Sequence, residues 1–498
     1  MIFTVETLDQ KNRYLSYIRE IATTNTLYAT KYLDFGTKVL RVLCYSPKIL
    51  LFLEQQLSFA LKDEAPSYDE TIVFWQSEDI RQIAEKMDAK FSPKNNFRLR
   101  VEMLVCERQY PDILLIDTDF SKTTPFIRLS ALSDAIEAYD INSHTCYFGV
   151  TKLEPEEFIK QGHLFVQQLN VLLKTQTTNL THGAVFGYNG QGVLLCARGQ
   201  RGKSTLTVHS LLNGCEYVSD DYQMLEKQGN DLYAYPLYSI ITLSPEMYTK
   251  MYVDFNGKFC SNNARKDKYV FNISAYEEQF KTQYPIKMCL FPEIVSDDAP
   301  SIVPCSAEDK GRAIVQLIHS TVMQVRDLNN HDTIKKLFYM ICDLPFYKFN
   351  LSPNIAQNTK YLRDFMKQKQ FLTKEVDLPR YISDITFDLA NILDTKNYTF
   401  YSLNKFATNV YEMLLSGVPA QTIAQKLTHF LPKHPTLLDE FNLFVQTLKE
   451  CNLLQTLTKT YSKPIDLSVV FMAECGYKLS ILVYKTEQTQ ELINIIKG

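Results

Sequence analysis

The chain has 498 residues, which is too long for one ordinary domain and predicts two to four. Apolar residues make up 45% and charged residues 22%, as in soluble globular proteins, and the formal net charge is −3. This charge and the lack of a long basic stripe argue against nucleic acid as a partner. No apolar run reaches the length of a membrane span, so we expect no contact with a membrane.

The 11 cysteines contain no Cys-x-x-Cys pair, and several lie in apolar segments, among them Cys44, Cys106 and Cys196. That pattern favours free thiols over disulfides or zinc. The first residues have neither the basic region nor the apolar core of a secretion signal. We therefore expect a cytoplasmic protein.

Residues 1–140 are expected to form a small N-terminal α/β domain after a polar, partly helical lead-in over 1–30. The residues carry no obvious chemistry, so the default role is to pack on the next domain or to support oligomerisation. Strands are predicted at 38–44, 71–75 and 112–116, and a helix over 47–61 with Pro47 at its start.

A β-hairpin is predicted directly after His182. One strand begins at Val185-Phe186, Asn189-Gly190 is a typical hairpin turn, and the second strand ends at about Cys196. His182 stands at the start of this hairpin. A lone histidine can be structural or catalytic, and its spacing leaves both open.

Residues 197–205 follow this second strand and form a glycine-rich turn that ends in Gly-Lys-Ser-Thr. Glycines let backbone N–H groups approach phosphate oxygens, and the helix predicted to run to Leu212 adds the anion preference of its N-terminus. In this motif Lys203 reaches the β- and γ-phosphates and Ser204 binds magnesium. A chance Gly-Lys-Ser-Thr in a loop is the alternative. The candidate ATP-binding residues are Ala197, Arg198, Gly199, Gln200, Arg201, Gly202, Lys203, Ser204 and Thr205.

One residue departs from the usual G-x-x-x-x-G-K-[ST] pattern. Ala197 stands where the motif has its first glycine. Alanine is tolerable there if its φ stays negative.

Two adjacent carboxylates, Asp220 and Asp221, follow 17 residues after Lys203. The strand predicted at 216–218 returns them to the edge of the phosphate turn in a right-handed βαβ unit. Neighbours on a strand point to opposite sides, so one would bind magnesium and the other would accept a proton from an attacking hydroxyl. We expect Ser204 and Asp221 to hold the metal, while either aspartate can be the base. A solvated Asp-Asp turn is the alternative.

Taken in order, His182-Gly183-Ala184, the hairpin, the Gly-Lys-Ser-Thr turn and Ser219-Asp220-Asp221 resemble the HPr serine kinase/phosphorylase family. That family has a fold akin to phosphoenolpyruvate carboxykinase. The resemblance centres on residues 145–260 and suggests a P-loop kinase core over 141–370. It implies that Lys203 and Ser204 bind ATP and magnesium, that one aspartate activates the acceptor hydroxyl, and that His182 lies near the transferring phosphoryl group.

Other properties of the family transfer less directly. A family arginine that contacts phosphate has no match by motif, and Arg265, Lys266 and Lys268 are candidates, with a solvated basic loop as the alternative. The signature that accompanies phosphorolysis is absent, which favours a one-way kinase. The family is oligomeric, so the resemblance implies a homo-oligomer. Beyond the phosphate site, we expect paired strands over 231–241, a helix over 310–319, and a closing segment over 346–369.

Residues 375–455 are predicted to form a separate domain. The alternation in 385–389 and 398–401, around a turn at 394–397, predicts a β-hairpin. Three helices should follow. They are expected from Asn404 to Leu415, from Pro419 to about Phe430, and from Leu437 to Cys451.

This layout, with Tyr-Ser-Leu-Asn-Lys-Phe-Ala before the first helix, resembles winged-helix PqqD-like domains, the recognition elements of ribosomally made and modified peptides. The resemblance implies that a leader or precursor peptide binds the 375–455 domain as an added strand. A DNA-binding winged helix and a structural appendage are the alternatives. The tail, 456–498, contains an apolar stretch at 478–484 that is able to add a strand to another domain.

Together these features predict an ATP- and Mg²⁺-dependent serine/threonine kinase that acts on a recruited peptide or small protein. Asp220, Asp221, His182 and Lys203 are the candidate catalytic residues. Two alternatives remain open at this point. One is a non-catalytic, nucleotide-gated scaffold that presents a peptide to another enzyme. The other is a kinase for a small metabolite.

Overall fold

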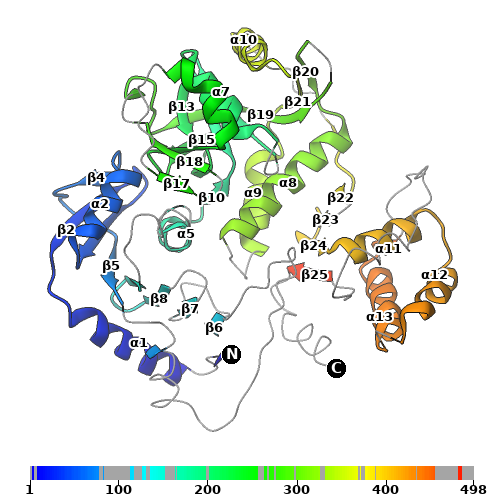
Figure 1. The fold of residues 1–498 in the computed structure, drawn as a ribbon, viewed down its shortest axis with the longest axis horizontal. Helices are drawn as coiled ribbons and strands as arrows, with labels where there is room; N and C mark the ends of the chain where they lie inside the picture. The colour runs from blue at the N-terminus through cyan, green and yellow to red at the C-terminus, as the bar shows by residue number, and fades with distance from the viewer. Residues whose placement is uncertain are drawn as a thin grey trace. The chain divides into compact units, whose positions relative to one another are not determined.

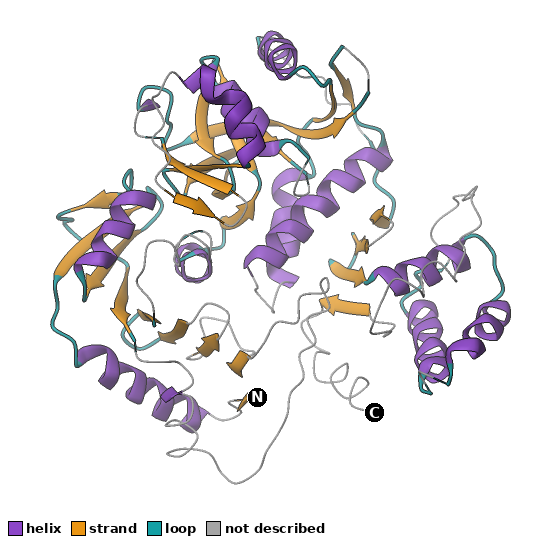
Figure 2. Ribbon diagram, viewed as in Figure 1, coloured by secondary structure: helices purple, strands orange, loops and turns teal. Residues whose placement is uncertain are grey.

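The structure is a computed structural model of a mixed α/β protein with several sheets (Figures 1 and 2). It forms two compact units. The first contains Met1–Val101, Gln109–Ser306 and Leu317–Glu375, and the second contains Glu102–Arg108, Ala307–Gln316 and Val376–Gly498. The structure describes residues 3–4, 8–77, 82–83, 113–116, 126–130, 135–151, 163, 165–197, 201–255, 263–265, 268–273, 276–296, 299–325, 331–367, 371, 376–386, 389–432, 435–454 and 481–484.

The N-terminal sheet of the first unit is mixed, with β3, β5 and β9 parallel to one another. Its central strand β5 is buried on both faces, as its near-continuous apolar sequence predicts. Val73 and Trp75 pack with helix α1 (Leu8–Thr23), whereas Ile72 and Phe74 belong to the cluster that contains α2 (Pro47–Gln56). In spatial order the strands are β1 (Phe3–Thr4), β6 (Ile113–Ile116), β7 (Phe126–Ser130), β8 (Ala135–Asp140), β9 (Thr145–Val150), β5 (Glu70–Gln76), β3 (Val39–Cys44), β2 (Ala29–Asp34) and β4 (Leu61–Lys62).

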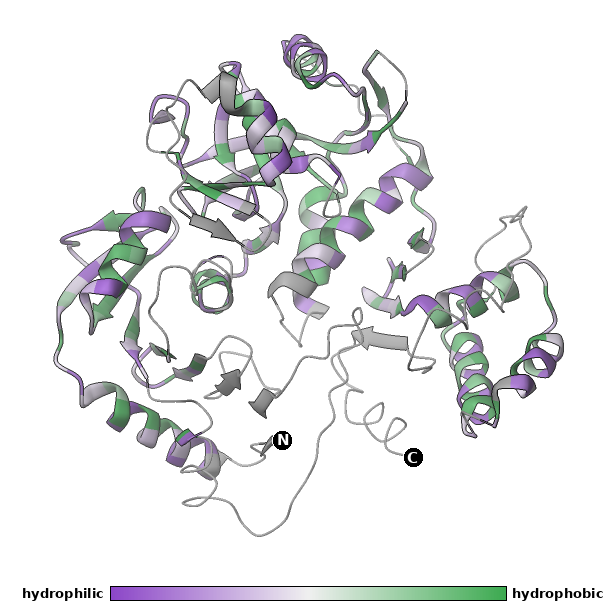
Figure 3. Ribbon diagram, in the orientation of Figure 1, coloured by the Kyte–Doolittle hydropathy of each residue, from purple (hydrophilic) through white to green (hydrophobic). Residues whose placement is uncertain are grey.

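The second sheet of this unit carries the candidate site. Hydrophobic and hydrophilic residues alternate along its strands, as the mixed colouring in Figure 3 shows. Ala184, Phe186, Val193 and Leu195 belong to its buried hydrophobic cluster. The order along the sheet is β10 (Thr178–His182), β14 (Tyr222–Gln228), β15 (Asp231–Pro236), β19 (Tyr284–Ile294), β12 (Gln191–Leu195), β11 (Ala184–Tyr188) and β13 (Glu216–Ser219), with β21 (Phe346–Leu351) also beside β19 and β20 (Ser301–Pro304) beside β21.

Helices and a small sheet surround these strands. Helix α6 (Lys203–Leu212) is nearly all buried because Leu206 packs with the sheet strands while Val208 and Leu211 join a second cluster. The remaining elements of this region are α5 (Val166–Leu173), α7 (Pro245–Phe255), α9 (His331–Ile341), α10 (Ile355–Met366) and the three-stranded sheet of β16 (Ile240–Leu243), β18 (Lys268–Asn272) and β17 (Asn263–Arg265).

The two larger sheets of the first unit share one hydrophobic cluster, which joins residues of β2, β3, β5 and α2 to residues of α5, β10, β14 and β15. Two hydrogen bonds support this packing. Ser239 N–H donates to Gln56 O at 2.7 Å, and Phe59 N–H donates to the side-chain Oγ of Ser239 at 3.1 Å. The N-terminal elements therefore pack on the sheet that carries the candidate site.

The second unit contains a sheet of four strands in the order β22 (Tyr381–Thr386), β23 (Leu389–Asp394), β24 (Thr399–Leu403) and β25 (Ile481–Tyr484). One face packs on α11 (Lys405–Leu415), α12 (Ala420–Leu427) and α13 (Leu437–Glu450), and a 3₁₀ turn over Thr428–Phe430 follows α12. Helix α8 (Ala307–Val325) begins in this unit, and its later residues belong to the first.

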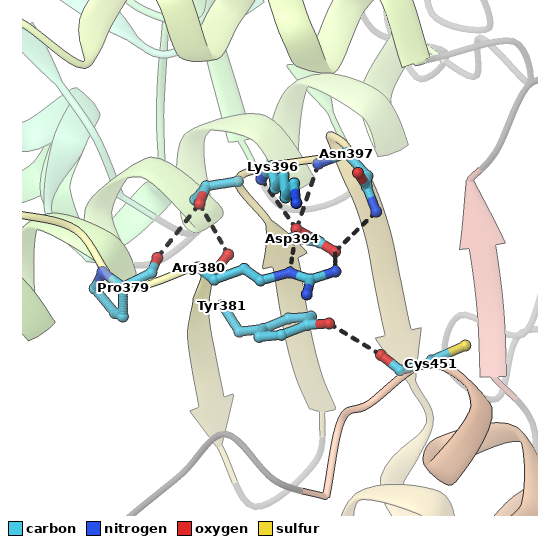
Figure 4. A network of polar contacts seen from close by, with 8 residues as sticks. Pro379, Arg380, Tyr381, Asp394, Lys396, Asn397 and Cys451 are labelled. Atoms are coloured by element: carbon cyan, nitrogen blue, oxygen red, sulfur yellow. Dashed lines mark hydrogen bonds and ion pairs between the residues drawn. The ribbon is translucent and has the colours of Figure 1, made fainter.

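Two features fix this sheet locally. Asp394 closes the β23–β24 turn by accepting from Lys396 and Asn397 N–H groups, and Arg380 donates to both of its oxygens (Figure 4). Gly311 of α8 lets this helix lie close to strand β22. A Cβ at Gly311 would lie 3.0 Å from Ile382 Cβ and Cγ2.

Several sequence predictions are confirmed. Asn189 and Gly190 both have positive φ in the hairpin turn, and Gly214, with φ +81, ends α6. Asn404 caps α11 by accepting from Ala407 N–H at 2.9 Å.

Other predictions were wrong in extent or pairing. The helix expected over 47–61 ends at Gln56, and the one expected over 310–319 runs from 307 to 325. Residues 231–241 do not form one pair of strands, because β15 pairs with β14 and β19 while β16 pairs with β18. In place of the predicted C-terminal hairpin, three successive strands pair with one another. The strand predicted at 385–389 is divided, with its start in β22 and its end in β23.

Within the described residues, no helix is long and apolar enough to cross a membrane.

Candidate nucleotide-binding and catalytic site

Strand directions bring the predicted site residues to one edge of the second sheet. β12 and β13 both run antiparallel to β11, so they are parallel to each other and their carboxyl ends lie at the same edge. His182 ends β10 opposite Tyr222, the first residue of β14. Gly183 N–H donates to Asp221 O at 2.9 Å, which links the start of β11 to the aspartate turn.

Gly183 has little room around it. A Cβ at this position would lie 3.2 Å from the carbonyl oxygen of Leu195 and 3.2 Å from Gln223 Nε2. Leu195 is the last residue of β12, immediately before the phosphate turn. Glycine therefore allows the His182 segment to pass close to the strand that leads into this turn.

The phosphate turn is described at its two ends. Ala197 is buried and does not have a positive φ, so alanine meets no backbone strain where the motif usually has glycine. Arg198, Gly199 and Gln200 lie outside the described residues. Gly202 is the N-cap of α6 with φ +83, a conformation that favours glycine.

Helix α6 begins at Lys203, whose side chain is buried. No side chain caps this N-terminus, and no acidic residue lies in its first turn. Uncapped N–H groups, the helix dipole and a buried ammonium group all favour an anion. These residues fit a bound polyphosphate, with Ser204 and Thr205 on the first turn as the sequence predicts.

The two aspartates occupy a tight turn between β13 and β14, where Ser219 Oγ donates to Tyr222 O at 2.7 Å. Asp220 is buried, and its Oδ2 accepts from Thr242 N–H at 3.1 Å. Asp221 contacts the same threonine differently, because its Oδ2 accepts from the Thr242 hydroxyl at the longer distance of 3.5 Å. The two side chains differ in their remaining neighbours, as their positions on an extended segment predict.

Two histidines approach Asp221. His182 Nε2 lies 3.7 Å from Asp221 Oδ1, and His163 Nε2 lies 3.7 Å from Asp221 Oδ2. All three side chains are at most 12% exposed. The carboxylate is thus set between two imidazoles in a poorly solvated place, where interactions between charges are stronger than in water.

Tyrosines complete this group. The centroid of the His163 ring lies 4.4 Å from that of Tyr238 and 4.9 Å from that of Tyr222. The ring centroids of Tyr222 and His182 are 5.1 Å apart. Burial, and secondarily the charge of Tyr222, raise the pKa of Tyr238 well above its usual value, so its hydroxyl stays neutral. The aromatic rings hold the imidazoles in place.

The backbone of His182 is also fixed. Its N–H donates to Thr321 Oγ1 at 2.9 Å, and its carbonyl accepts from Ser320 Oγ at 3.3 Å. These contacts from α8 place His182 at the end of β10, and they were not expected from the sequence.

The sequence analysis missed His163. It lies 19 residues before His182 and outside any helix or strand, so neither periodicity nor a motif singles it out. Its place beside Asp221 depends on packing against Tyr222 and Tyr238.

The proposed basic partners of the phosphates are not brought to this site by any described contact. Arg265 ends β17 and Lys268 begins β18, and the backbones of these two residues pair with each other. Lys266 lies outside the described residues. Across the described ranges, no three His, Cys, Asp or Glu side chains are arranged to hold a metal ion.

No family model and no curated protein matches the chain. Among solved structures, the HPr(Ser) kinase/phosphatase from Coxiella burnetii matches 38% of this chain and 99% of its own, with 12% identity and a TM-score of 0.23. Part of the chain thus resembles that structure.

Proposed function

We propose that this protein is an ATP-dependent kinase that transfers a phosphoryl group to a serine or threonine hydroxyl. The observation that carries the proposal is the convergence of three strand ends. Lys203 follows β12, Asp221 follows β13, and His182 ends β10, all at one edge of the sheet. This edge offers phosphate-binding groups and a carboxylate together.

The phosphate side of the site consists of Lys203 and the first turn of α6. In the proposal Lys203 contacts the β- and γ-phosphates, and the N–H groups of the turn bind their oxygens. Ser204 would hold magnesium, which would neutralise charge on the phosphates. Magnesium commonly takes only one or two protein ligands beside phosphate oxygens and water.

Asp221 fits the role of proton acceptor better than Asp220 does. Asp220 is buried and bonded to the Thr242 backbone, so moving or protonating it would disturb β16. Each oxygen of Asp221 lies 3.7 Å from an imidazole nitrogen, and Oδ2 also accepts from the Thr242 hydroxyl at 3.5 Å. The imidazole neighbours suit proton transfer more than coordination of a hard cation. We therefore assign the base to Asp221 and leave magnesium to Ser204 and the phosphates.

In the transfer, Asp221 accepts the proton of the acceptor hydroxyl while the hydroxyl oxygen bonds to the γ-phosphorus. The bond between the γ-phosphorus and the oxygen that bridges it to the β-phosphate breaks, and ADP leaves. Lys203 and His182 stabilise charge on the moving group. His163 keeps the Asp221 carboxylate in place from the side opposite His182.

For the acceptor we propose a peptide or small protein, such as a ribosomally made precursor peptide, recruited by the second unit. Two features support this. The unit has a small sheet packed on three helices, the layout of the peptide-recognition domains that its sequence resembles. It also has strand edges, which bind extended peptides by main-chain hydrogen bonds.

The test uses the purified chain, ATP labelled at the γ-phosphate, magnesium, and a panel of synthetic precursor-type peptides that contain serine and threonine. We expect label on a serine or threonine of a peptide. Lys203→Ala should lose both nucleotide binding and labelling, while Asp221→Asn should keep nucleotide binding and lose labelling. Lys250→Ala, at an exposed ion pair with Glu246, is the matched control and should behave as wild type.

The outcome for Asp221→Asn separates the kinase from a nucleotide-gated scaffold. Suppose that the wild-type protein binds ATP without labelling any peptide, and that Asp221→Asn supports as much modified peptide in the cell as wild type does. Phosphoryl transfer is then excluded. Label appearing on a small metabolite and not on the peptide would retain the kinase and reject the peptide acceptor.

A further inference from the structure

The sheet of the second unit is completed by a strand from far along the chain. β25 pairs antiparallel with β24, with Leu403 opposite Ile481 and Phe400 opposite Tyr484. The strands β22, β23 and β24 follow one another directly, whereas β25 comes after all three helices of the unit. Figure 4 shows β25 as the pale red arrow at the side of this sheet.

β24 is buried over its whole length, although the outer strand beside it is short. Tyr401 and Leu403 belong to the helix-lined cluster, while Phe400 and Ser402 are buried on the opposite face. A buried strand leaves costly unpaired N–H and C=O groups if its edge is open. The edge of β24 therefore requires a strand partner.

The strand that fills this edge is weakly held compared with its neighbours. β25 pairs over four residues, against six between β22 and β23 and five between β23 and β24. In the described sheet it has one neighbour, β24. Short outer strands open first in native sheets because few bonds hold them.

We propose that the edge of β24 is a strand-accepting site that the chain fills with its own β25, and that an extended acceptor peptide displaces β25 from it. The identity of the competing peptide rests on the proposed function. The site itself rests on the pairing of β24 and β25. In this view the tail holds the site closed until a better-fitting peptide replaces it.

The register predicts what such a peptide needs. Residues directly opposite in an antiparallel pair share a face of the sheet. A peptide in the register of β25 places alternate residues beside Tyr401 and Leu403, on the face of the helix-lined cluster. Those positions should be apolar, and no proline should stand where its missing N–H breaks the ladder.

The first test measures binding of a fluorescent peptide with the sequence of residues 478–486 by fluorescence anisotropy. The peptide is titrated with three proteins: the intact chain, a chain that ends at Ser480, and the double variant Leu482→Pro, Val483→Pro of the intact chain. We expect at least about tenfold tighter binding to the last two, since their edge is open. A peptide with proline at the positions of 482 and 483 is the control and should not bind.

Equal affinity for the intact and shortened chains would overturn the proposal, as would no binding to a shortened chain that unfolds like the intact one. If the variants do not fold, hydrogen exchange on the intact chain decides. Amides of Ile481–Tyr484 should exchange at least about tenfold faster than those of β23. Equal protection of the two strands would show that β25 is not displaceable.

These readouts are independent of phosphoryl transfer. Loss of peptide labelling with strand exchange intact would reject the kinase proposal alone. Labelling that persists, with affinity unaffected by β25, would reject this inference alone.

Discussion

Asp220 Oδ2 accepts a hydrogen bond of 3.1 Å from the main-chain N–H of Thr242. Both residues are buried, so this bond ties the aspartate turn to the third residue of β16. Asp221, the next residue, accepts from the Thr242 hydroxyl at 3.5 Å and also lies 3.7 Å from both His163 and His182. We therefore propose that Asp220 is mainly structural and that Asp221 carries the chemistry.

This division predicts opposite effects of two alanine substitutions. Asp220→Ala leaves a buried N–H without its partner and should lower the free energy of unfolding by about 1–3 kcal/mol. Asp221→Ala removes longer contacts, of 3.5 Å to the Thr242 hydroxyl and 3.7 Å to each imidazole, so it should lower stability less than Asp220→Ala does. It should lower the rate of phosphoryl transfer by about 10²–10⁴-fold. Chemical denaturation and the labelling assay measure the two effects. The assignment is wrong if Asp221→Ala is the strongly destabilised variant and Asp220→Ala keeps wild-type stability.

Two glycines at opposite ends of α6 provide a matched test of the phosphate turn. Gly202 and Gly214 have φ of +83 and +81, so alanine at either should cost about 1–2 kcal/mol of stability through backbone strain. Only Gly202→Ala should also weaken ATP binding, because Gly202 precedes the N-terminus of α6. Calorimetric titration with ATP tests this difference. Equal nucleotide affinity of the two variants would argue against phosphate binding at this turn.

His163 should act as a positioning residue for Asp221. In His163→Gln the Asp221 carboxylate loses one of its two imidazole neighbours. We expect kcat to fall about tenfold, which corresponds to an activation free energy higher by ~1.4 kcal/mol, with ATP affinity unchanged. His429→Gln, at an exposed histidine of the second unit, is the control. A change in ATP affinity without a change in kcat would instead place His163 on the nucleotide side.

Buried thiols predict a defined alkaline response. Burial raises the pKa of Cys215 and of Cys44 to about 12, from about 9 in the unfolded chain. Because the folded pKa is the higher one, the stability due to the neutral thiols is complete below pH 9 and is lost as pH rises from 9 towards 12.

We expect the free energy of unfolding to fall more steeply between pH 8 and 10.5 in wild type than in Cys215→Ala. At pH 8 the native chain should resist alkylation at Cys215 while the partly exposed Cys342 reacts. Rapid modification of Cys215 in the native protein would contradict its burial.

Local signals in the sequence determined much of the site. The Asn189-Gly190 turn, the start of α6 at Lys203 and its end before Gly214 all follow from residues within a few positions of each other. The same holds for the helix that Asn404 caps. Turn conformations, caps and apolar periodicity depend on neighbours in the chain, so they can be predicted without the fold.

The tertiary structure decided which distant residues meet. It brought His163 to Asp221, tied Asp220 to Thr242, and set β25 beside β24. It also showed that residues 231–241 belong to two different sheets. Such pairings depend on strand order and on packing between segments far apart in sequence, and no local pattern specifies either. The sequence therefore identified the phosphate-binding turn and the aspartate pair, while only the fold separated the roles of the two aspartates.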